Sequence, residues 1–154
     1  MTNIPTHRPL IIGRRGAVAS NHPLATQAGL DVLRGGGNAV DAAVAVAFAL
    51  GAAEPHMSGV GGDGFYHLFR ADTGANVVYN ATGSAPAASS TAAYPQGIPD
   101  EGPASISTPG AVAGLDALHR AHGRRPWAEL LQPAIAIARD GFGVTLTYRF
   151  YAEE

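Results

Sequence analysis

The chain contains no cysteine, and this absence removes three kinds of chemistry at once. Disulfides, thiolate zinc sites and a cysteine nucleophile are all excluded. Long apolar runs are also missing: the longest, residues 42–53, is about twelve residues and too short to span a bilayer. The N-terminus has no apolar segment of signal-peptide length, so we expect a cytoplasmic protein with no membrane partner.

Charged residues are scarce, at 14% of the chain against roughly 25% in typical soluble domains. The ten basic and twelve acidic residues are scattered, and no block of one sign predicts nucleic acid as a partner. Hydrophobic residues make up 46% of the sequence. This composition is more typical of a piece whose faces are covered by further protein than of a free-standing domain.

Apolar residues that recur every four positions predict a first helix over residues 23–34. They are Leu24, Ala28 and Val32. Asn21 is the expected N-cap. The glycine run 35–37 is expected to end the helix, because glycine adopts positive φ freely.

A second helix is predicted over residues 38–53, where Asn38 and Asp41 have the spacing of a capping box. Its residues 42–50 are apolar on every side, and a helix without a polar face is a buried helix. We expect it to lie under a sheet. In this chain alone it should lack partner surface and therefore drive association.

Alternating side chains predict a β-hairpin over residues 64–80, with the turn at Asp72-Thr73-Gly74. From residue 81 to residue 107 the sequence is rich in Ala, Ser, Pro and Gly and shows no period. A structureless stretch of this length inside a compact domain is uncommon, and it is usually functional or mobile.

Two further helical segments are predicted after this stretch. Thr108 and Pro109 have the pattern of an N-cap followed by an N1 proline, for a helix to about residue 122. Pro133 is expected to divide the last segment. The expected halves are residues 127–131 and 133–140. The resulting order α-α-β-β-α-α indicates the α+β class, with helices covering antiparallel strands.

Motifs that could carry chemistry are incomplete. The glycine cluster of residues 59–64 follows a helix and precedes a strand, the reverse of a phosphate-binding loop. His119 and His122 have helical spacing, but zinc needs a third ligand; carbonyls at the helix end are their alternative partners. Ser58 and Ser84 lack G-x-S-x-G surroundings. The residues alone therefore predict no complete catalytic group, no metal site and no cofactor.

Four sequence blocks, in the same order, resemble the large subunit of γ-glutamyltranspeptidases. They are Leu24–Val46, Ser58–Phe65, Ser107–Leu115 and Gln132–Phe142. The resemblance implies a partial N-terminal-nucleophile hydrolase fold, an αββα sandwich represented here by helices and a hairpin. It implies residues 1–15 as a tail and residues 16–154 as the N-terminal segment of the large subunit, truncated at its C-terminus.

The family resemblance also implies a mechanism. A precursor of this kind cleaves itself before a threonine, which becomes the first residue of a small subunit. The threonine attacks γ-glutamyl amides such as glutathione, and the γ-glutamyl group passes to water or to an amino acid. That threonine lies beyond this chain. We therefore expect no catalytic residue here, little activity from the chain alone, and the small subunit of the same precursor as a partner.

The resemblance implies that Thr82, Gly83 and Ser84 line part of the substrate pocket. The family carries an arginine here that clamps the substrate α-carboxylate, yet no arginine lies between Arg70 and Arg120. A hydroxyl does not replace a bidentate guanidinium. Three interpretations stay open: a γ-glutamyltransferase fragment, a fragment of a related acylase for a different amide, and a non-catalytic binding module. A solvated turn after the strand is the structural alternative for Thr82 and Ser84.

Overall fold

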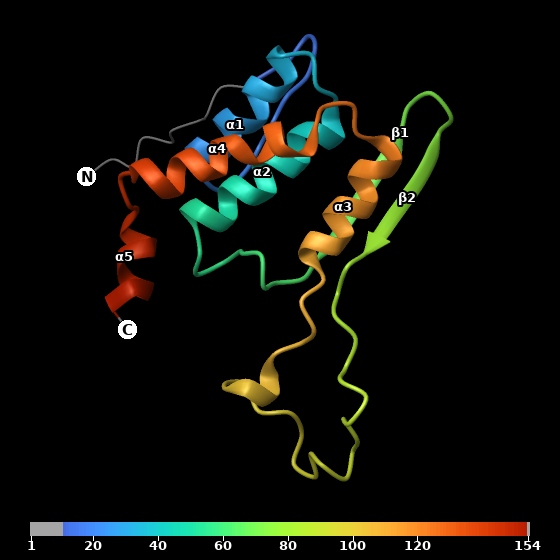
Figure 1. Cartoon of the computed structure of the whole chain (residues 1–154), viewed down its shortest axis with the longest axis vertical. Helices are drawn as coiled ribbons and strands as arrows, with labels where there is room; N and C mark the ends of the chain where they lie inside the picture. The colour runs from blue at the N-terminus through green and yellow to red at the C-terminus, as the bar shows by residue number, and fades with distance from the viewer. Residues whose placement is uncertain (1–10, 154) are drawn as a thin grey trace, which may run out of the picture.

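Residues 11–153 are described by a computed structural model that combines helices with one β-hairpin (Figure 1). The elements are α1 (Pro23–Arg34), α2 (Ala39–Ala53), β1 (Phe65–Arg70), β2 (Ala75–Asn80), the 3₁₀ helix η1 (Pro103–Ser105), α3 (Ala111–His122), α4 (Trp127–Asp140) and α5 (Leu146–Glu153). The predicted α+β class is confirmed. Over these residues, no helix is long and apolar enough to cross a membrane.

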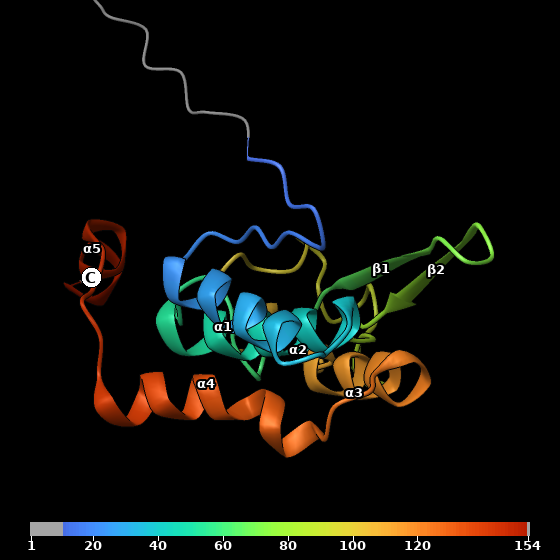
Figure 2. The ribbon, with the colours of Figure 1, turned by 90° about the horizontal axis from the view of Figure 1, so that it is seen from above.

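Helix α2 is the centre of the helical part, with α1 and α4 packed against it (Figure 2). Its apolar residues fill two core clusters. One contains Val44, Ala45, Leu115 and Leu130; the other contains Ala25, Ala28 and Ala49. Within the described residues α1 and α4 cover α2, and the hairpin packs on α3, so no sheet lies over α2 here. Val46, Phe48 and Leu50 of α2 stay only partly buried, and the expectation of missing partner surface stays a prediction. The helices approach closely: a Cβ added at Gly29 would lie 2.6 Å from Cγ2 of Val46.

The predicted ends of α1 and α2 agree with the structure, except that the N-cap of α1 lies one residue later. The N-cap of α1 is His22 instead of Asn21, because the His22 Nδ1 atom accepts from the Leu24 N–H at 3.2 Å. At the other end Gly36 has a φ of 88°, as expected of the glycine run. The capping box of α2 is confirmed.

The C-terminal helices differ from the predictions. Helix α3 begins at Ala111 with Gly110 as N-cap, and no side chain caps it. Helix α4 is continuous through Pro133. The proline removes an N–H that would bond the Glu129 carbonyl, and that turn faces solvent, so water can take the place of the lost donor. Helix α5 was not predicted.

The hairpin over 65–80 is confirmed, with β1 and β2 antiparallel. One face packs against α3, and there Tyr66 and Tyr79 lie directly opposite each other. On the other face Phe65, Phe69 and Val78 are each more than half exposed. The hairpin therefore has one buried and one open face in this chain.

Residues 82–109 leave the hairpin, extend away from the helices and return to α3; we call them the arm (Figure 1). Its only regular element is η1, in agreement with the lack of a period in the sequence. The arm begins and ends at the same place, beside the C-terminal end of β2 and the N-terminal end of α3. This junction is where the predicted site residues lie.

Candidate functional site at the base of the arm

Thr82, Gly83 and Ser84 lie together at the base of the arm and line one hollow of about 530 Å³. Three stretches of chain form this hollow: the end of β2 with the start of the arm, the end of the arm, and the first turns of α3. The lining residues are Val78, Tyr79, Asn80, Ala81, Thr82, Gly83, Ser84, Thr108, Pro109, Gly110, Ala113, Gly114 and Ala117. The structure thus brings the three predicted residues to one concave surface.

Glycines make the base of the arm possible, because the two chain segments touch there. A Cβ added at Gly83 would collide with the Thr108 carbonyl, and one at Gly110 would collide with the Ala81 carbonyl. The N–H groups of Gly110 and Ala111 both donate to the Gly62 carbonyl, at 3.1 and 3.0 Å. The glycine segment before β1 therefore anchors the start of α3, and Gly83 has a packing role whether or not it contacts a ligand.

The side chain of Asn80 fixes Thr82. The Thr82 N–H donates to the Asn80 Oδ1 atom at 3.0 Å, and the Thr82 hydroxyl donates to the same oxygen at 2.6 Å. This local turn uses the short polar side chain of asparagine as a backbone turn would. Both donors of Thr82 are consequently engaged within the loop.

Among residues 11–153, no acidic, arginine or histidine side chain lines this hollow. Asp63 in the glycine segment is anchored to the end of the arm, because its carboxylate accepts from the Ser107 hydroxyl at 3.0 Å. Burial, and secondarily the negative charge of Asp63, raise the pKa of the Tyr66 phenol above its ordinary value. The lining therefore supplies hydroxyl, amide and backbone groups for contact with a substrate, but no positively charged side chain.

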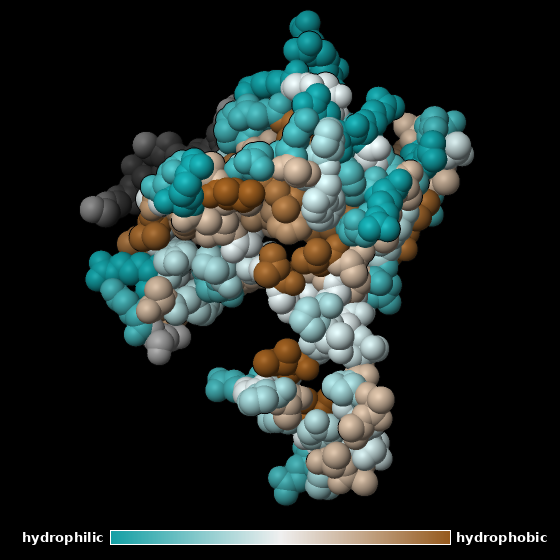
Figure 3. All heavy atoms as spheres, viewed as in Figure 1, coloured by the Kyte–Doolittle hydropathy of each residue, from teal (hydrophilic) through white to brown (hydrophobic). Residues whose placement is uncertain are grey.

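A larger hollow, of about 730 Å³, lies between α2, the glycine segment, α3 and α4. Apolar side chains predominate around it, including Met57, Val60 and Ile135, and each of these is exposed. Figure 3 shows hydrophobic side chains on the side of the helices that faces the arm. This hollow contains no predicted site residue.

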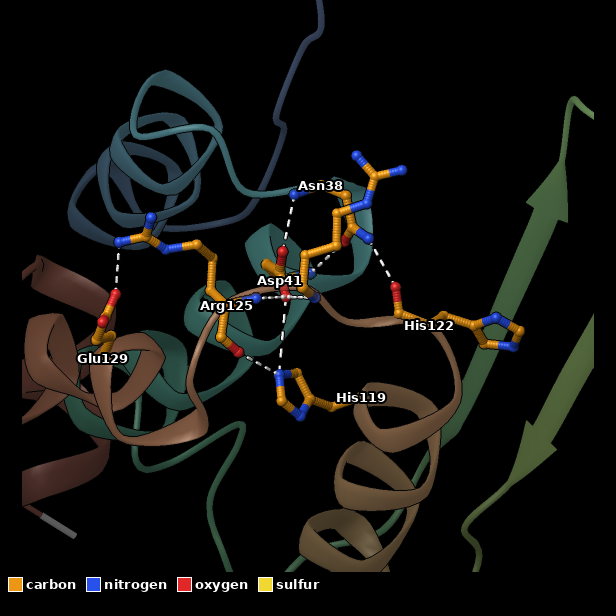
Figure 4. A network of polar contacts seen from close by, with 7 residues as sticks. Asn38, Asp41, His119, His122, Arg125 and Glu129 are labelled. Atoms are coloured by element: carbon orange, nitrogen blue, oxygen red, sulfur yellow. Dashed lines mark hydrogen bonds and ion pairs between the residues drawn. The ribbon is translucent and has the colours of Figure 1, made fainter.

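The two helix-end histidines do not form a pair (Figure 4). The His119 Nε2 atom lies 2.8 Å from the Arg125 carbonyl, whereas the His122 Nε2 atom lies 3.0 Å from the Tyr79 hydroxyl. Within residues 11–153, no group of three or more His, Asp or Glu side chains could hold a metal ion. His119 therefore interacts with a free carbonyl near the helix end, the alternative that the sequence left open.

Sequence reasoning missed Asn80, Tyr79 and His122 as parts of this region. The spacing of Asn80 and Thr82 is a signal for Asn80, because asparagine two residues before a backbone N–H commonly forms such a turn. The contact of Tyr79 with His122 joins residues far apart in the sequence, and no local pattern reports it.

The family model for gamma-glutamyltranspeptidase matches residues 25–154. The chain belongs to this family. It is 43% identical over 148 residues to the acylase ACY 1 proenzyme of Pseudomonas sp. (strain SE83), covering 86% of this chain and 26% of that protein. It is 34% identical over 149 residues to the glutathione hydrolase proenzyme of Bacillus subtilis (strain 168), covering 90% of this chain and 25% of that protein.

The fold agrees with the sequence match. The γ-glutamyltranspeptidase of Pseudomonas nitroreducens, solved in complex with L-DON, superposes with a TM-score of 0.84 and 34% identity. That likeness covers 92% of this chain and 44% of the solved chain. The chain spans about a quarter of the length of the curated relatives named above. The family resemblance of the four sequence blocks is therefore confirmed.

Proposed function

We propose that residues 16–154 are the first segment of the large subunit of an amide-cleaving precursor. A threonine outside this chain would attack the amide carbonyl carbon, forming an ester with the acyl group while the amine leaves with a proton. Water or a second amine then takes the acyl group and restores the hydroxyl. The observation that carries this proposal is the family match over residues 25–154 together with the shared fold.

The proposal extends to the fold of the complete enzyme. We infer that the hairpin belongs to an αββα sandwich completed by the small subunit of the same precursor. Support comes from the open face of the hairpin, where Phe65 and Phe69 are 65% and 59% exposed. Further support comes from the relatives, which are named proenzymes.

Within the site, we propose that the base of the arm contacts the acyl part of the substrate. A γ-glutamyl group is the acyl group expected from the family resemblance, and its α-carboxylate requires strong donors. At Thr82 both donors already serve Asn80, and no guanidinium lines the hollow. This geometry favours the second candidate, an acylase whose amide substrate carries no α-carboxylate at this position.

Mass spectrometry of the protein from its source tests the catalytic proposal. A second chain that begins with threonine, or a larger precursor that yields one, is the expected result. A lone 15.7 kDa chain would overturn the proposal and favour a non-catalytic binding module.

A matched pair of anilides tests which acyl group is used. The γ-glutamyl and 4-aminobutanoyl p-nitroanilides differ only in the α-carboxylate. We expect the processed enzyme to cleave the second at least as well as the first. Thr82→Arg should then raise kcat/KM for the γ-glutamyl compound about tenfold or more, since a bidentate guanidinium–carboxylate pair is a strong contact. Ala88→Arg places the same charge on the exposed arm and is the control. A strong preference of the unsubstituted enzyme for the γ-glutamyl compound would favour the transferase instead.

A further inference from the structure

Two tyrosines on the buried face of the hairpin hold α3 at both ends. Tyr66 and Tyr79 are cross-strand partners, yet their hydroxyls bond to opposite ends of α3. The Tyr66 hydroxyl donates to the carbonyl of Ala111, the first residue of α3, at 3.1 Å. The Tyr79 hydroxyl lies 3.0 Å from Nε2 of His122, the last residue of α3. These contacts are separated by the length of the helix, so together they fix its direction along the hairpin.

His122 is itself anchored to the helical core. Its carbonyl accepts from the Asn38 Nδ2 atom at 2.6 Å, and Asn38 is the N-cap of α2 (Figure 4). Asn38 is in turn bound by Asp41, a fully buried carboxylate that accepts from the Asn38 N–H at 2.8 Å. The imidazole of His122 therefore projects from a firmly held turn toward β2.

Tyr79 links His122 to the candidate site. It immediately precedes Asn80, whose Oδ1 atom holds both donors of Thr82. The path from the core to the hollow thus runs through His122, Tyr79 and Asn80 to Thr82. Each step is a covalent neighbour or a hydrogen bond of 3.0 Å or less.

We propose that Tyr79 and His122 are positioning residues, which hold the end of β2 so that Thr82 faces the acyl part of the substrate. The proposal rests on the proposed function, because it takes the hollow at the base of the arm as the acyl site. Neither residue is assigned a chemical step.

Amide hydrogen exchange tests the positioning without any activity. Tyr79→Phe keeps the ring and removes the hydroxyl, so the Thr82 N–H should exchange about fivefold faster, the factor expected for loss of one hydrogen bond. Tyr66→Phe removes the same group at the other end of α3, and there the faster exchange should appear near Ala111 instead. Unchanged exchange at Thr82 in Tyr79→Phe would overturn the proposal.

Kinetics of the processed enzyme separate positioning from general damage. Tyr79→Phe and His122→Leu should raise KM for the preferred anilide about fivefold and change kcat less than twofold. His122→Gln should restore most of the affinity, because its amide can still reach the Tyr79 hydroxyl. Equal losses in kcat for both His122 variants would overturn the positioning role. Faster Thr82 exchange with unchanged KM would support the positioning and overturn the acyl site assigned under the proposed function.

Discussion

The helical core of α1, α2 and α4 and the arm are ordered in different ways. In the core, buried alanines, Val44 and Leu130 pack tightly, and side chains cap the N-terminal ends of α1 and α2. In the arm, Ile98 and Ile106 are each 64% exposed, and Gly97 and Gly102 adopt positive φ. The core is therefore stabilised by burial inside this chain, whereas the arm is held by its base. Because it is held only at its base, the arm leaves the side chains of Ile98 and Ile106 exposed to neighbouring protein or solvent.

Limited proteolysis should show the largest difference between the two regions. Thermolysin, which cleaves before large apolar residues, is expected to cut before Ile106 in the arm at least about a hundredfold faster than before Phe48 in α2, because local opening costs least where few apolar contacts must break. The fragments are identified by mass spectrometry at short times. Comparable cleavage rates at the two positions would show that the arm is as well protected as the core.

The buried carboxylate of Asp41 gives a large expected effect on stability from a single substitution. It accepts from the N–H groups of Asn38, Arg124 and Arg125, at 2.8, 2.9 and 3.2 Å, and so ties α2 to the turn between α3 and α4. Asp41→Ala leaves three donors without their acceptor and should lower the free energy of unfolding by about 3 kcal/mol. Urea denaturation measures this change.

Asp116 is the matched control for Asp41, as an aspartate on a helix paired with Arg120 at the surface. Asp116→Ala should change the free energy of unfolding by about 0.5 kcal/mol or less, since exposed ion pairs contribute little. Equal effects of the two alanine substitutions would mean that the hydrogen bonds of Asp41 contribute no more to the free energy of unfolding than an exposed ion pair does.

A pair of truncations compares the core with the arm directly. Leu130 is 1% exposed, and Leu130→Ala should cost about 3 kcal/mol of unfolding free energy through lost burial and the cavity left behind. Ile106→Ala removes a similar side chain from the arm and should cost about 0.5 kcal/mol or less. Thermal or urea unfolding of both variants gives the comparison. A large loss for Ile106→Ala would show that the arm packs against protein in solution.

The same contrast explains what the sequence could predict. The periodic segments of α1, the capping box of Asn38 and the hairpin were found because their signals are local. The continuity of α4 through Pro133 was missed, because its packing on α2 outweighs the local cost of a proline. The start of α3 was placed too early, since the close approach of Gly110 to Ala81 is a tertiary contact. The residues of the candidate site were located by family resemblance, and the link of Tyr79 to His122 required the fold.

The smallest expected effect is on the pH dependence of the free energy of unfolding, through Tyr66 near the base of the arm. Burial and the charge of Asp63 raise the pKa of Tyr66 in the folded protein, while the unfolded phenol ionises with a pKa of about 10. Above that pH the unfolded chain releases a proton that the folded chain retains, so the free energy of unfolding should fall as pH rises through the alkaline range. Tyr66→Phe should show a weaker fall, and Asp63→Asn a partial reduction of it, in urea unfolding between pH 8 and about 11. Identical pH dependence in all three proteins would mean that Tyr66 is as solvated in the folded chain as in the unfolded one, and that the base of the arm is open to water at this tyrosine.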